Sequence, residues 1–359
     1  MAKVAALRTR PETVLEDYER LLKLAEYEKY LPKERDTALK INISWQNYYP
    51  ACSSAPWQIE GVIRAMIRDG YSRDLVHACH NRTVVVDARH GEVANKHLPV
   101  IEKYGLRNIH LYDPSEEWVT YEPRGKMLVL RDIYPEGIQI PRRLIGENIL
   151  HLPTIKTHVF TTMTGAMKNA FGGLLHDRRH WTHSVIHETL VDLLTIQKEI
   201  HSGVFAVMDG AFVGDGPGPR CMEVRVGGWI LASADQVAID ATAARLMGFD
   251  PMSIKFIRLA HEAGLGVGNP SEIEMVGDDI QGVNFGCRKG DNTFASKGQK
   301  MIYWGPLKPL ENILLRSPLV PWSYLASRAY HDVYWYNAIG KPRIRDAMQT
   351  DWGELFQRY

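Results

Sequence analysis

The sequence predicts an α/β fold in which a mostly parallel sheet is flanked by helices. Short β-branched and apolar runs alternate with segments whose apolar residues recur at helical spacing, and Gly and Pro separate many of them. With 45% apolar residues in 359, the chain can bury the core of one large domain or two coupled ones. We expect an N-terminal helical arm (1–35), an α/β domain (36–303) with possible lobes at 36–150 and 151–303, and an aromatic-rich C-terminal extension (304–359).

Composition excludes several classes of function. Lys and Arg number 43 against 42 Asp and Glu, with no long run of one sign, so a nucleic-acid partner is not expected. The four cysteines lie far apart and form no CxxC pair, which argues against a cysteine-ligated iron–sulfur cluster or structural zinc. The sequence shows neither a secretory signal nor 18 uninterrupted apolar residues, so we expect no transmembrane segment and a cytoplasmic location.

The first third of the chain has the alternation of a parallel α/β domain. An amphipathic helix is expected within 11–30, followed by a strand over 38–45 and a helix over 59–71. A β-branched strand over 83–88, a helix over 90–106 and a strand over 108–113 come next. Asp87 and Asp113, at the ends of these two strands, are read as turn or capping residues rather than ligands.

The middle of the chain continues this pattern after a less regular insertion. Residues 125–132 and 137–144 are interpreted as strands of an antiparallel insertion, and 148–158 as an apolar strand. A buried strand is expected in 203–210, and a strand followed by a helix in 229–248. The extension from Trp304 holds four of the nine tryptophans among several prolines, which favours a subunit interface of a homo-oligomer or packing within the chain.

Residues 151–191 hold six of the fourteen histidines and are the presumptive site. If TIKTH ends a strand, Lys156 and His158 lie on one face and point together into the space above the sheet. Thr164 is the expected N-cap of a short helix that Gly165 opens and a glycine pair closes, with Lys168 in its first turn.

A lysine in the first turn opposes the positive end of the helix dipole unless an anion neutralises both. Free backbone amides there, together with Lys156, Lys168 and Asn169, are expected to form a cradle for a phosphate or carboxylate. Arg178 and Arg179 are further candidates for binding such an anion, although exposed arginines beside a loop are common.

Four histidines follow at spacings of four, three and four, which places them on one face of a helix: His176, His180, His183 and His187. Three interpretations stay open, namely proton transfer or substrate binding, a divalent metal site, and purely structural buried histidines. The metal set would combine His176, His180, His183 and Asp215, although the HExxH signature is absent.

The blocks PTIKTHVFTTMTGAMKNAFGG, VMDGAFVGDGPGP and ASADQVAIDATAARLMGFDP resemble those of the bacterial and archaeal family called domain of unknown function 362. Many members carry an appended ferredoxin-like domain and are described as iron–sulfur proteins, but the cysteine runs are missing here. The resemblance adds residues at family positions: Lys40, Asn42, Asp209, Gly216, Pro217, Ser233, Asp235 and Asp240. Ser233 or Asp235 is alternatively a helix cap.

A second, weaker similarity is to the histidine and lysine block of nickel-dependent lactate racemases, and it implies acid–base chemistry on a small hydroxy acid. The leading hypothesis is an enzyme that holds a small anion with Lys156 and Lys168 and transfers protons with His158, helped by His180 or His183. Isomerase, lyase and metal-assisted hydrolase chemistry stay open. The alternatives are a histidine-ligated metalloprotein and a non-catalytic binding or scaffold subunit.

Overall fold

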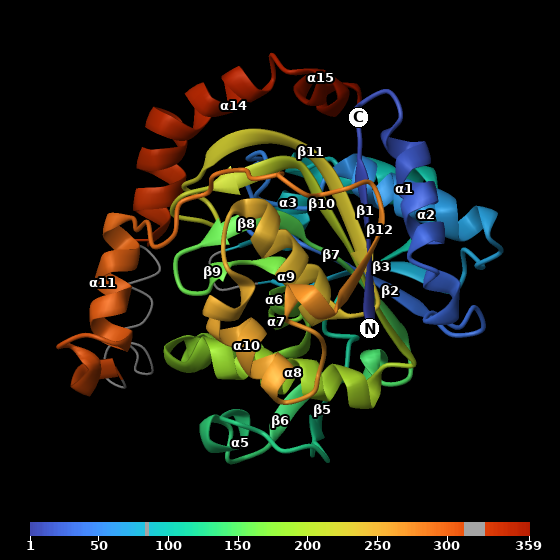
Figure 1. Ribbon diagram of the computed structural model, residues 1–359. Helices are drawn as coiled ribbons and strands as arrows, with labels where there is room; N and C mark the ends of the chain where they lie inside the picture. The colour runs from blue at the N-terminus through green and yellow to red at the C-terminus, as the bar shows by residue number, and fades with distance from the viewer. Residues whose placement is uncertain (83–85, 312–326) are drawn as a thin grey trace.

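The computed structural model describes residues 1–82, 86–311 and 327–359. Its main feature is a ten-stranded mixed sheet in which β12, β1, β11, β10, β7, β2, β3 and β4 are neighbours in that order, and β8 and β9 extend it beside β10 (Figure 1). The strands of this sheet are β1 Ala2–Arg8, β2 Thr37–Ile41, β3 Val76–His80, β4 Arg107–His110, β7 Asn148–Leu152, β8 Thr154–His158, β9 Thr162–Met163, β10 Gly203–Asp215, β11 Glu223–Ser233 and β12 Ile273–Gly277.

Most neighbouring pairs in this sheet are parallel, as expected. β2 pairs in parallel with both β3 and β7, whereas β11 is antiparallel to its neighbours β1 and β10. The chain leaves β2 toward β3 on one side and later returns to β7 on the other, so strand order reverses between β2 and β7. Ligands of open α/β sheets bind beyond the carboxyl ends of the strands at such a point.

Helices cover both faces of the sheet, which gives three layers (Figure 1). The core consists of two hydrophobic clusters, one on each face of the sheet. Alternate residues of β1 belong to different clusters: Ala5 and Leu7 pack on one face and Ala6 on the other. The first face is covered by α1 Val14–Leu24, α2 Pro56–Arg68, α4 His97–Lys103, α14 Lys341–Ala347 and α15 Asp351–Arg358. The second is covered by α6 Gly165–Asn169, α7 Phe171–Leu174, α8 Ile186–Ile200, α9 Gln236–Met247 and α10 Lys255–Glu262.

The remaining elements are short or lie at the rim. The antiparallel insertion is present as β5 Trp118–Tyr121 paired with β6 Ile138–Pro141, near α5 Leu130–Ile133, and α3 Ala88–Ala94 precedes α4. α11 Phe294–Tyr303 and the π-helix η7 Ala329–Gly340 lie on the left rim in Figure 1. The 3₁₀ helices are η1 Tyr27–Lys29, η2 Arg142–Leu144, η3 Asp177–Val185, η4 Pro251–Ser253, η5 Pro270–Glu272 and η6 Lys308–Leu310.

Several sequence expectations need correction. Residues 1–35 are not only a helical arm, because Ala2–Arg8 forms a strand inside the sheet, with Val4 to Leu7 fully buried. β7 pairs with both β2 and β10, so one sheet continues across residue 150, and the division into two lobes stays a prediction. Residues 125–132 are not a strand: three amides from Leu128 to Leu130 donate to the buried Asp192 carboxylate, and α5 begins there.

The third strand lies earlier than expected. The sequence pattern favours 83–88, of which 83–85 lie outside the described residues, and β3 is Val76–His80. Its sequence VHACH is less β-branched than TVVVDA, so strand propensity does not point to β3. The sequence pattern therefore misses His80, which lies at the carboxyl end of this parallel strand.

The C-terminal extension packs largely on its own chain. Trp335, Trp352 and Phe356 are buried in the core cluster of the α1–α2 face. Trp335 also packs against Trp45 and Tyr49, with ring centroids 6.0 and 5.4 Å apart. Packing within the chain, one of the two readings of this segment, therefore accounts for these three aromatic residues.

Asp209 is a buried carboxylate that ties α1 and α2 to the sheet. Its Oδ2 accepts hydrogen bonds from the Tyr18 hydroxyl at 2.6 Å and from Trp57 Nε1 at 2.9 Å, and its Oδ1 accepts from the Ala211 amide. Burial raises the pKa of Asp209 to about 6 although these donors act in the opposite direction. Asp209 is thus a structural residue here rather than a ligand-binding one.

We predict that Tyr18→Phe lowers the free energy of unfolding by about 1–3 kcal/mol, because the buried carboxylate loses a donor. The pKa of Asp209 is raised on folding, so its proton uptake stabilises the fold at low pH and this contribution is lost as pH rises through about 6. The cost of Tyr18→Phe should therefore be larger at pH 8 than at pH 5 in urea denaturation. Tyr30→Phe, at a 43% exposed tyrosine, is the control; equal costs for both variants would contradict the prediction.

Candidate functional site

A cavity of about 330 Å³ lies at the carboxyl ends of β2, β3 and β8. Its cationic and imidazole side chains are Lys40, Lys168, Arg179, Arg220, His80, His158, His180, His183 and His331. Among the side chains that the structure describes, no Asp or Glu lines it. Apolar side chains complete the wall, including Phe160, Phe171, Ile302 and Tyr303. This charge imbalance favours a negatively charged occupant.

Lys40 is the last residue but one of β2, and its side chain packs beside Gly172 and Gly173 at the cavity. A Cβ at Gly173 would lie 3.0 Å from Lys40 Cε, so the missing side chain leaves room for the lysine stem. Gly172 and Gly173 lie inside α7. The expectation that they end the helix that begins at Gly165 is therefore wrong. Lys40 Nζ donates to the Ile41 carbonyl at 2.6 Å, and burial lowers the pKa of Lys40 to about 8.

Lys168 on α6 also faces the cavity. Its Nζ lies 5.3 Å from the centroid of the Phe171 ring, and burial, reinforced by the nearby Arg179, lowers the pKa of Lys168 to about 8. Arg179 is 6% exposed and donates to the carbonyls of Leu175 and Arg82. Because the Arg179 charge also lowers the pKa of Lys40, the three cations share one region of the cavity.

The amides at the start of α6 are not free to bind a ligand. The amides of Ala166 and Met167 donate to the two oxygens of the Asp240 carboxylate at 2.5 and 3.0 Å. Gly165 has φ +72°, and a Cβ there would lie 2.4 Å from Asp240 Oδ1, so both its conformation and its neighbour require glycine. The expected anion cradle is therefore wrong in its backbone part, since the Asp240 carboxyl group, whose pKa burial raises to about 8, already accepts from these amides.

Thr164 comes directly before α6 and Asn169 is its last residue, and both line the cavity. Thr164 does not cap α6 with its hydroxyl, which is buried without a hydrogen-bond partner in the described structure. Asn169 Nδ2 donates to the Lys40 carbonyl at 2.8 Å and thereby links α6 to β2.

Lys156 lies behind the cavity wall rather than in it, contrary to the expectation. It is fully buried, and its Nζ donates to Asn42 Oδ1, the Cys52 carbonyl and Thr154 Oγ1 at 2.7–2.9 Å. Burial lowers the pKa of Lys156 to about 7. Asn42 lines the cavity, so Lys156 contacts the site indirectly, through its hydrogen bond to the Asn42 side chain.

His158 and His183 present opposite hydrogen-bonding groups. His158 Nδ1 accepts from the Phe160 amide at 3.1 Å, so in the neutral ring the proton is on Nε2. His183 Nδ1 lies 3.0 Å from the His180 carbonyl and must donate to it, which leaves a lone pair on Nε2. Burial lowers the pKa of both rings, to about 4 for His183, so both are neutral at pH 7.

The four histidines do not share one helical face. Residues 177–185 form η3, and a 3₁₀ helix has three residues per turn, so only the pair spaced by three, His180 and His183, points the same way. His176 is exposed and packs against Trp118, whereas His187 packs against Phe256. Arg178, also exposed, lies over Trp181 and 3.9 Å from Glu136.

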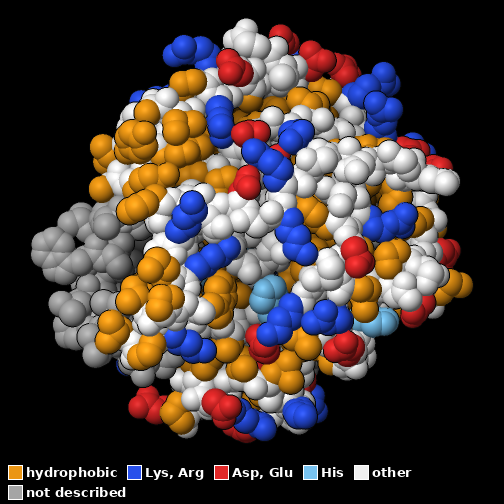
Figure 2. All heavy atoms as spheres, turned by 60° about the vertical axis from the view of Figure 1, so that its left-hand side comes forward, with side chains coloured by type: hydrophobic (Ala, Val, Ile, Leu, Met, Phe, Trp, Pro, Cys, Tyr) orange, Lys and Arg blue, Asp and Glu red, His pale blue; other side chains and the backbone are white. Residues whose placement is uncertain are grey.

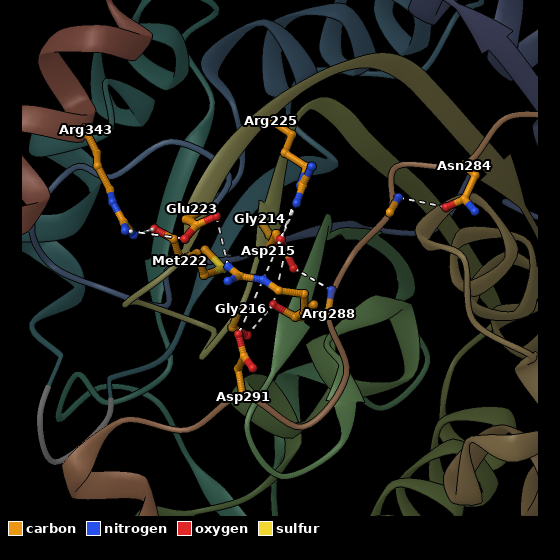
Figure 3. A network of polar contacts seen from close by, with 12 residues as sticks. Gly214, Asp215, Gly216, Met222, Glu223, Arg225, Asn284, Arg288, Asp291 and Arg343 are labelled. Atoms are coloured by element: carbon orange, nitrogen blue, oxygen red, sulfur yellow. Dashed lines mark hydrogen bonds and ion pairs between the residues drawn. The ribbon is translucent and has the colours of Figure 1, made fainter.

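The predicted metal set is not brought together. Within residues 1–82, 86–311 and 327–359, no group of three or more His, Cys, Asp and Glu side chains has an arrangement that could hold a metal ion. Asp215 is fully buried and accepts from Arg225 and Arg288, and its other oxygen accepts from the Arg288 amide (Figure 3). This network holds the segment that leads to α11, which contributes Ile302 and Tyr303 to the cavity wall.

The other candidate aspartate and serine residues are structural. Asp235 caps α9 through the amides of Val237 and Ala238, as the alternative reading held, and also accepts from the Val267 amide. Ser233 Oγ donates to the Lys3 carbonyl and accepts from the Asp235 amide. Neither residue lines the cavity.

A family model described as "Domain of unknown function (DUF362)" matches residues 37–245, more than half of the chain. The chain belongs to this family. The matched range contains Lys40, His158 and Lys168, whereas the α11 wall of the cavity lies outside it. The chain is also 26% identical over 130 residues to the thylakoid-associated protein sll1697 of Synechocystis sp., a match that covers 35% of this chain and 40% of that relative.

Sequence reasoning missed His80, Arg220 and the residues of α11. His80 ends a strand that the sequence pattern does not predict, and Arg220 follows a Gly-Pro loop that carries no periodic signal. α11 lies in the distant C-terminal part of the sequence, and only tertiary structure brings it to the cavity. None of the helices that the structure describes has the length and apolar content needed to span a membrane.

We predict that Gly165→Ala destabilises the protein by more than Gly146→Ala. Both glycines have positive φ, +72° and +88°, so each variant loses about 1–2 kcal/mol from the backbone conformation. Only at Gly165 does the added Cβ also collide with Asp240, whereas Gly146 has open space. Denaturant unfolding of the two variants checks this, and similar losses would show that the Asp240 contact does not constrain α6.

Proposed function

We propose that this protein is an enzyme that binds a small phosphate- or carboxylate-bearing substrate in the cavity and moves a proton on it. The observation that supports this best is the cavity lining, which combines Lys40, Lys168 and Arg179 with no acidic side chain among the described residues. Burying the ammonium groups of Lys40 and Lys168 in their charged form is costly, and a bound anion would offset that cost. The guanidinium group of Arg179 and the ammonium groups of Lys40 and Lys168 can donate hydrogen bonds to the oxygens of a phosphate or carboxylate.

The proton transfer is assigned to the neutral histidines His158 and His183. His158 offers an Nε2–H donor, and His183 offers an Nε2 lone pair, so the pair can donate and accept a proton without either ring starting as a cation. Both rings contact Phe160, at centroid distances of 5.8 and 5.7 Å, which places them around the same part of the cavity. The reaction class that fits is proton transfer beside an anionic group, as in an isomerase or lyase.

We predict that inorganic phosphate raises the melting temperature of the wild-type protein and that Lys168→Met removes most of this shift. Lys297→Met, on the exposed surface of α11, should keep it. A panel of phosphorylated and carboxylated metabolites in the same thermal assay then identifies the preferred anion. The absence of any shift across the panel, or equal shifts in both variants, would contradict the anion site.

We predict further that phosphate affinity falls as pH rises above about 8. The pKa values of Lys40 and Lys168 are lowered to about 8 by burial, so both ammonium groups are charged below that pH and lose their charge above it. Titration calorimetry at pH 7 and pH 9.5 measures the effect. Affinity that is unchanged between these values would mean that neither lysine contributes its charge to binding.

A subunit interface is a second proposal, for the part of the C-terminal region that is not packed on its own chain. Phe294 and Trp304 of the α11 segment are 84% and 43% exposed, and Val333 and Tyr334 of η7 are 67% and 59% exposed. In Figure 2 hydrophobic side chains gather in two groups on the left of the molecule, toward this rim.

A cytoplasmic location likewise stays a prediction from the sequence.

A further inference from the structure

The cavity has an apolar wall that a small inorganic anion would leave uncovered. Its volume of about 330 Å³ falls in the range of about 300–1,000 Å³ typical of pockets for organic ligands, which are much larger than a phosphate ion. Phe160, Ile302 and Tyr303 belong to its lining. Phe160 follows β8, and Ile302 and Tyr303 come from the end of α11. A phosphate held by the lysines would fill only part of the cavity and leave this apolar surface in contact with water.

Polar side chains of the α11 wall are already hydrogen-bonded within the chain. Thr293 and Ser296, which both line the cavity, form a reciprocal pair. Thr293 Oγ1 accepts from the Ser296 amide at 3.0 Å, and Ser296 Oγ accepts from the Thr293 amide at 2.9 Å. Because these hydroxyl groups have partners, the wall offers more to a hydrocarbon group than to the hydroxyl groups of a sugar.

The histidine assigned to proton acceptance lies between the cations and this wall. Lys168 Nζ lies 5.3 Å from the centroid of the Phe171 ring, which is 5.5 Å from that of His183. The His183 ring lies in turn 5.7 Å from Phe160 and 5.9 Å from Tyr303. A ligand whose anionic group lies at Lys168 would therefore pass His183 before it reaches the aromatic side chains.

We propose that the substrate is an amphipathic anion, in which a phosphate or carboxylate is joined to a hydrocarbon group that packs against Phe160, Ile302 and Tyr303. This rests on the proposed function and adds the class of substrate. The atom that gains or loses a proton then lies between the two parts of the substrate, beside His183. Burying the hydrocarbon group removes apolar surface of both ligand and wall from water, which favours it over a hydroxylated group of equal charge.

Phosphates that share the charged group and differ in the attached group test the proposal: inorganic phosphate, phenyl phosphate and glucose 6-phosphate. Titration calorimetry of the full-length wild-type protein at pH 7 should show phenyl phosphate binding at least about tenfold more tightly than inorganic phosphate. Glucose 6-phosphate should bind no more tightly than inorganic phosphate, because its hydroxylated ring gains little from an apolar wall.

Neighbouring residues of α11 provide a matched pair of variants. Ile302 lines the cavity, whereas Met301 is 46% exposed and lies outside the lining. Ile302→Asn should lower the ratio of phenyl phosphate affinity to inorganic phosphate affinity at least about threefold, because it replaces apolar surface of the wall with an amide. Met301→Asn should keep the wild-type ratio.

The outcomes separate this proposal from the proposed function. Equal wild-type affinities for phenyl phosphate and inorganic phosphate, or glucose 6-phosphate binding as tightly as phenyl phosphate, would overturn the amphipathic substrate while supporting the anion site. The same ratio in Ile302→Asn and Met301→Asn would also overturn it. Binding of none of the three phosphates would contradict the anion site itself. If Ile302→Asn fails to fold, wild-type ¹³C spectra decide, since the Ile302 methyl signals should shift with phenyl phosphate and not with inorganic phosphate.

Discussion

Cationic side chains that converge on one cavity, with no Asp or Glu among the lining side chains that the structure describes, are the constraint on which the rest of this structure depends. Burial lowers the pKa of Lys40 and of Lys168 toward neutrality, because their charged forms are poorly solvated there. The rest of the fold must hold such groups in place. β2 pairs with β3 and β7, and Asp240 holds the first amides of α6.

The aspartates at family positions supply much of that fixation. Asp240 holds the first amides of α6, Asp235 those of α9, and Asp209 joins β10 to α1 and α2. Asp215, outside that set, binds Arg225 of β11 and Arg288 of the segment before α11. These carboxylates are satisfied by donors within the chain, so they stabilise the scaffold and leave the cavity to the lysines, arginines and histidines.

The histidines of the cavity differ in role because their backbone contacts differ. The Phe160 amide makes His158 a donor toward the cavity, and the His180 carbonyl makes His183 an acceptor. Glu92 of α3 lies 3.5 Å from His80 Nε2 and accepts from His110 Nε2. Neutral imidazoles of opposite hydrogen-bonding character beside cationic side chains can both donate and accept protons.

The sequence by itself determined the α/β class, most of the strand–helix alternation and the cap at Asp235, because these follow from local periodicity and capping preferences. It also identified Lys168, Arg179, His158, His180 and His183, which line the cavity. Only the tertiary structure showed that β1 joins the sheet, that Lys156 is buried behind the wall, and that Asp240 occupies the amides of α6. Those facts depend on contacts between residues far apart in the chain, such as Asp240 with Ala166 and Lys156 with Asn42, and no local pattern encodes such partners.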